Sequence, residues 1–122
     1  MKIVVAYRGI PQSPGWATGD SLARAFVSLG HTVWRYGNYY QQATWIEPCP
    51  WADAEPDLLV RLECNDADPQ YPELCDRWRC PRVYWEFDTA MHVPFTRTHL
   101  SEHGYDRVFM ANARYTAHFG AR

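Results

Sequence analysis

Two residues beside the apolar run RVYWEF have side chains that could carry out acid–base chemistry. Asp88 directly follows this run, and His92 lies in the same predicted loop. A carboxylate or an imidazole at such a place can remove the proton of an attacking hydroxyl group. In the alternative interpretation, Asp88 caps a turn and His92 is a solvated loop residue.

A loop rich in glycine and proline, residues 9–19, supplies a second group of candidates. It leads into a predicted helix, whose free backbone N–H groups and dipole suit an anionic or hydroxyl-rich ligand. Trp16 could stack on a sugar ring or fill the gap between loop and helix. Ordinary strand-to-helix loops also contain glycines, so a purely structural loop is the alternative. The residues that could contact a substrate are Gly15, Trp16, Gly19, Asp20, Glu63, Asn65, Thr89 and Asn112.

Three familiar ligand-binding patterns of α/β proteins are absent from the sequence. The dinucleotide fingerprint needs closely spaced glycines, whereas Gly9, Gly15 and Gly19 are too far apart. The P-loop and the phosphoacceptor receiver domain both require a lysine, and the only lysine is Lys2. We therefore predict that the chain carries no cofactor.

The cysteines and histidines do not form a metal-binding pattern. No CxxC pair is present, and the cysteine spacings are irregular, so we predict no zinc site and no disulfide. Reduced thiols fit a cytoplasmic location. The residues concerned are Cys49, Cys64, Cys75, Cys80, His99, His103 and His118.

Charge and hydropathy exclude further classes of partner. A formal net charge of −2 gives no field that would attract nucleic acid or an anionic membrane. The apolar stretch in MKIVVAYRG is too short for a signal peptide or a membrane span. We expect neither nucleic acid nor a membrane among the partners.

The elements that must position these residues alternate between strand and helix. Apolar runs predict strands over 3–7, 31–36, 57–62, 82–87 and 107–111. Helical periodicity and capping residues predict helices over 18–29, 72–79, 95–103 and 113–119, the first ended by Gly30. The aromatic-rich stretch 37–56 predicts at most a short helix over 41–46, and could stack on a sugar or pack under the sheet.

This alternation predicts a single α/β domain over residues 1–122 with a doubly wound, Rossmann-like parallel sheet. The expected order of its five strands is 3-2-1-4-5, which places the first strand between the second and the fourth. Ligands of such sheets bind at the carboxyl ends of the strands, near the point where the strand order reverses. Glu86 lies within the fourth predicted strand, and an ion pair with an arginine such as Arg82 is its structural interpretation.

Several stretches resemble the N-terminal domain of GT-B glycosyltransferases. "KIVVAYRG" and "SLARAFVSLGHTVWRY" are similar to the opening of that fold. "CPRVYWEFDTAMH" and "HLSEHGYDRVFMANARYTAHF" resemble the CgeB-like spore-maturation subgroup. The similarity covers essentially the whole chain, and "LGHTV" and "YWEFD" are its sharpest parts.

The resemblance implies an acceptor-side domain that binds a sugar or glycan acceptor. Asp88 or His92 would then deprotonate the acceptor hydroxyl. The nucleotide-sugar donor would be held by a second domain, which we expect to be absent from this chain, so that the chain alone would be inactive and would bind nucleotide sugars weakly or not at all. The alternative is a small flavodoxin-like module that binds or regulates a partner without enzymatic activity.

A homodimer is the prediction for assembly. If the chain stops at Arg122, the edge of the last predicted strand and the following helix lack neighbours, which favours pairing with a second copy. Phe109, Tyr115 and Phe119 would be buried in that contact. Light scattering at micromolar concentration measures the mass, and a strictly monomeric mass would contradict the prediction.

Overall fold

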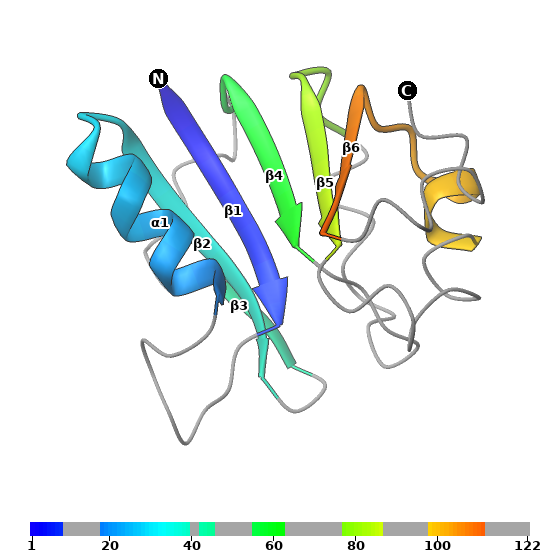
Figure 1. Cartoon of the computed structure of the whole chain (residues 1–122), viewed down its shortest axis with the longest axis horizontal. Coiled ribbons are helices and arrows are strands. Elements are labelled where there is room, and N and C mark those ends of the chain that lie inside the picture. The colour runs from blue at the N-terminus through cyan, green and yellow to red at the C-terminus, as the bar shows by residue number, and fades with distance from the viewer. Residues whose placement is uncertain (9–17, 40–41, 46–54, 63–76, 87–97, 112–122) are drawn as a thin grey trace.

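The strands of the chain form one mixed sheet with helical segments against it (Figure 1). The computed structural model describes residues 1–8, 18–39, 42–45, 55–62, 77–86 and 98–111. The elements are β1 (Lys2–Arg8), α1 (Thr18–Ser28), β2 (Thr32–Tyr39), β3 (Gln42–Trp45), β4 (Leu58–Leu62), β5 (Arg82–Glu86) and β6 (Arg107–Met110). The strand order is β3-β2-β1-β4-β5-β6.

The central strand, β1, contains a continuous apolar run, residues 3–7, that is buried on both faces of the sheet. Such a run suits a strand in the middle of a parallel sheet, where helices or loops cover both sides. β1 pairs in parallel with β2 on one side and with β4 on the other. The expected α/β domain with five parallel strands is confirmed.

The predicted strand order was wrong, and β3 explains the difference. Residues 42–45 are a strand that pairs antiparallel with β2, where the sequence had suggested a short helix over 41–46. β3 therefore occupies the outer side of β2, the place expected for the third parallel strand. The third parallel strand, β4, lies beside β1 instead, with Ile3 opposite Leu58. The fourth parallel strand, β5, is therefore not a neighbour of β1.

The first helix ends as its sequence predicts. Gly30 has a φ of 86°, which a residue with a side chain rarely adopts. Its N–H donates to the Val27 carbonyl at 2.9 Å, and the His31 N–H donates to the Phe26 carbonyl at 3.1 Å. This pair of bonds is a Schellman motif, and it turns the chain directly from α1 into β2.

Two other predicted helices fall partly within the described residues. Residues 98–102 are helical, as the periodicity of 95–103 indicates. Residues 77–79 are not helical, so the helix expected over 72–79 does not extend that far, and residues 72–76 lie outside the described part. The helix predicted over 113–119 also lies outside it. Among the described helices, none is long and apolar enough to cross a membrane.

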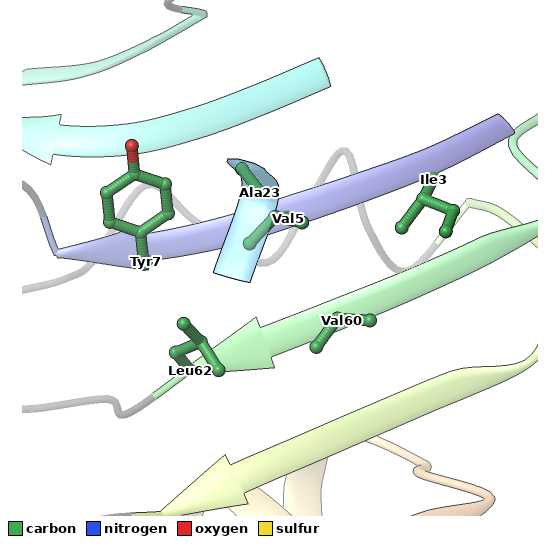
Figure 2. Packing of buried hydrophobic residues seen from close by; sticks show 6 residues of the cluster. All are labelled: Ile3, Val5, Tyr7, Ala23, Val60 and Leu62. Carbon is green, nitrogen blue, oxygen red and sulfur yellow. The ribbon is translucent and has the colours of Figure 1, made fainter. Parts of the chain in front are cut away.

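The core has two layers, one on each face of the sheet. On one face, α1 places Ala23 over side chains of β1 and β4 (Figure 2). The opposite face buries Val4, Ala6, Leu59 and Trp78. Because alternate residues of each strand point to opposite faces, β1 and β4 contribute to both layers.

A pair of valines tests this packing. Val60 is 3% exposed beneath α1, whereas Val27 on α1 is 57% exposed. We expect Val60→Ala to lower the free energy of unfolding by about 2 kcal/mol, because it leaves a cavity in the core. Val27→Ala should change it by less than about 0.5 kcal/mol. Urea unfolding followed by tryptophan fluorescence measures both, and equal losses would contradict the packing.

Candidate functional site

The carboxyl ends of the parallel strands meet at one edge of the sheet (Figure 1). Residues 9–17, 63–76 and 87–97 follow β1, β4 and β5 at this edge. The predicted strand order reverses between the first and fourth parallel strands, which are β1 and β5. The observed order reverses between β1 and β4, the third parallel strand. The segments that follow β1 and β4 are therefore the expected borders of a ligand site.

Two of the predicted site residues, Gly19 and Asp20, lie in the first turn of α1 at this edge. Both are buried. The remaining predicted residues lie outside the described part of the chain: Gly15, Trp16, Glu63, Asn65, Asp88, Thr89, His92 and Asn112.

Asp20 joins three elements through its carboxylate. The Tyr7 hydroxyl at the end of β1 donates a hydrogen bond to Oδ1 of Asp20. Nη1 of Arg35 on β2 lies 2.8 Å from the same oxygen and forms an ion pair with it. Asp20 is only 2% exposed, and a buried carboxylate needs such partners to offset its lost hydration. The positive end of the α1 dipole is a further favourable neighbour.

Gly19 allows the Tyr7 ring to lie against the backbone of α1. A Cβ atom at position 19 would be 2.1 Å from Cγ of Tyr7, far inside the van der Waals limit. The absence of a side chain at this position therefore lets the ring reach Asp20. Gly19 therefore has a packing role in this structure. From the sequence alone, this role could not be distinguished from contact with a ligand.

A second polar group lies on the face of the sheet opposite α1. Arg61 on β4 is opposite Tyr84 on β5 in the parallel register, so their side chains share this face. The Tyr84 hydroxyl donates a 2.6 Å hydrogen bond to Oε2 of Glu86. Arg61, Tyr84 and Glu86 are each 2% exposed or less.

His99 and Tyr105 complete this group, which we call the β4–β5 polar cluster: Arg61, Tyr84, Glu86, His99 and Tyr105. The His99 ring centroid lies 5.5 Å from that of Tyr84 and 5.5 Å from that of Tyr105. Nε2 of His99 and the Tyr105 hydroxyl are 2.6 Å apart, which is hydrogen-bonding distance.

The surroundings keep His99 neutral. Burial lowers the pKa of His99 from 6.5 to about 2, and the charge of Arg61 and the nearby His103 act in the same direction. An imidazole with so low a pKa is a poor general base at neutral pH, because base strength falls with pKa. His99 is therefore suited to hydrogen bonding in its neutral form.

Sequence reasoning missed most of this cluster, although it contained a signal. Arg61 interrupts the apolar strand LLVRL, and Glu86 interrupts VYWEF. Charged residues are rarely fully buried, so one inside a central strand indicates a specific partner. The sequence suggested an arginine such as Arg82 as the ion-pair partner of Glu86. The structure shows it bonded to Tyr84, and Nη2 of Arg82 donates to the Trp78 carbonyl.

The described residues offer no group of three or more His, Cys, Asp or Glu side chains that could hold a metal ion. Cys80 is a free thiol, and the other cysteines lie outside the described part. Comparison with models of known protein families gave no match, and no curated protein matched the sequence.

Two glycines test the contact between Tyr7 and α1. Gly19→Ala should lower the free energy of unfolding by about 1–3 kcal/mol, the usual cost of overpacking, because the added methyl group overlaps the Tyr7 ring. Gly104→Ala is the matched control, since a Cβ there meets nothing within 4 Å. We expect it to change stability by less than about 0.5 kcal/mol in guanidinium unfolding. A tolerated Gly19→Ala would show that the ring does not rest on the helix.

Proposed function

We propose that this chain is the acceptor-side domain of a cytoplasmic glycosyltransferase, which transfers a sugar from a nucleotide-sugar donor to a hydroxyl acceptor. The sequence resemblance to the N-terminal domain of GT-B enzymes motivates the proposal. The observation that carries it is the reversal of strand order between β1 and β4. Open α/β sheets bind their ligands at such a point.

The residues on either side of this point suit an acceptor rich in hydroxyl groups. The segment after β1 contains Gly15 and Trp16, and the segment after β4 contains Glu63 and Asn65. An indole can stack on the apolar face of a sugar, and carboxylate and amide groups can hydrogen-bond its hydroxyls. The proposal assigns acceptor binding to these residues.

The segment after β5 supplies the proposed base. β5 is the neighbour of β4, and Asp88 and His92 follow it in sequence. In the proposed reaction one of these groups takes the proton from the acceptor hydroxyl as its oxygen attacks the donor sugar, and the bond between that sugar and its nucleotide breaks so that the nucleotide leaves. Thr89 and Asn112 would orient the acceptor. Positioned bases of this kind contribute roughly 10²–10⁴-fold to rates.

A second candidate function follows from the same topology. The parallel strands have the order found in flavodoxin-like proteins, which bind a flavin nucleotide or act as regulatory modules. This order favours the alternative of a small binding or regulatory module without enzymatic activity. A fold by itself does not determine function, so ligand binding must decide between the two.

Sugar binding provides the test. We expect saturation-transfer NMR to detect binding of neutral mono- or disaccharides to the protein, and Trp16→Ala to weaken it about tenfold, which corresponds to the loss of about 1.4 kcal/mol. Phe109→Ala is the aromatic control, because Phe109 is exposed on β6, away from β1 and β4. It should leave sugar binding unchanged.

Two outcomes of this test would contradict the proposal. Binding of flavin mononucleotide with no response to any sugar would support the flavodoxin-like alternative. Equal effects of Trp16→Ala and Phe109→Ala on sugar binding would contradict the assignment of Trp16 to the acceptor site.

A further inference from the structure

The helical residues 98–102 are joined to β5 through an aromatic contact. The His99 ring packs against Tyr84, whose side chain is completely buried. His99 also contacts Tyr105, and the Tyr84 and Tyr105 ring centroids are 5.3 Å apart. These three rings form one packed unit between the sheet and the chain that leads into β6.

The charged and titratable groups that face His99 come from each neighbouring element. β4 contributes Arg61, and β5 contributes Tyr84 and Glu86. His103 lies on the same segment, with its ring centroid 4.5 Å from that of His99. Among the described residues of the cluster, Glu86 supplies the carboxylate, and Tyr84 donates a hydrogen bond to it.

Protonation of His99, which is partly buried, would place a second cation near Arg61. An ion loses hydration energy when it is buried, and a like charge adds to that cost. The pKa of about 2 expresses the same balance, with burial as its largest cause and Arg61 as the second. Protonation therefore favours a form in which the ring is more fully hydrated.

We propose that His99 is an acid-sensitive latch, which holds the segment 98–102 against β5 while neutral and releases it when protonated. This inference concerns a conformational change and does not depend on the proposed transferase function. Release would uncover Tyr84, Glu86 and Arg61 near the carboxyl ends of β4 and β5.

The direction of the pH effect follows from linkage. The pKa of His99 is below the value of 6.5 for an exposed histidine, so the latch is fully closed above pH 6.5. As the pH falls below 6.5, the opening constant should rise about tenfold per unit, because the open form binds a proton that the closed form excludes. Between pH 7.5 and pH 4.5 the increase is about hundredfold.

Amide hydrogen exchange measures this opening on the protein as it is. The His103 N–H donates to the His99 carbonyl at 2.9 Å, so its protection reports on the latched segment. After correction for the intrinsic exchange rate, its protection should fall about hundredfold between pH 7.5 and 4.5. At each pH it should be less protected than the Val5 amide of the central strand, because local opening precedes global unfolding.

Variants separate the titration of His99 from its packing. His99→Phe retains an aromatic ring but cannot be protonated, so the protection at His103 should then change less than about threefold over the same range. His31→Gln is the matched histidine control at the start of β2, and it should keep the hundredfold response. If His99→Phe fails to fold, NMR titration of the wild-type His99 ring decides the question.

Three results would overturn the latch. The first is a His99 ring that titrates near pH 6.5 while the His103 amide remains protected. The second is equal protection of the His103 and Val5 amides at every pH, which would mean that only the whole domain opens. The third is an unchanged pH response in His99→Phe.

Discussion

The contact of the Tyr7 ring with the backbone of Gly19 sets the distance between the end of β1 and the start of α1. The ring can reach Asp20 only because position 19 has no side chain, and Arg35 then adds β2 to the same contact. Three elements are thereby fixed at their ends.

The two faces of the sheet bury different kinds of side chain. Beneath α1 the core consists of aliphatic side chains and Tyr7, whose polar atom is bonded to Asp20. On the other face an arginine and a glutamate are buried among aromatic rings. Burying a charge costs free energy unless hydrogen bonds replace its hydration, so this face depends on polar contacts such as the bond from Tyr84 to Glu86.

Local signals in the sequence were sufficient for β1, for α1 and for the turn at Gly30, because each depends on neighbouring residues. The strand order was not predictable in this way. The strand order depends on β3, and its short segment QATW contains no turn residue that would predict a hairpin. Gly19 and Asp20 were identified as candidates, but their partners Tyr7 and Arg35 were not, since these lie on strands read only as apolar runs. Arg61 and Glu86 were visible as charges in buried strands, yet only the register shows that they share a face.

Both outermost strands of the sheet, β3 and β6, have four residues, whereas β1 has seven and β2 has eight. An edge strand exposes backbone groups that can recruit strands from other molecules, and a short edge offers few of them. Within the described residues, the border strands β3 and β6 therefore expose few backbone groups with which another strand could pair.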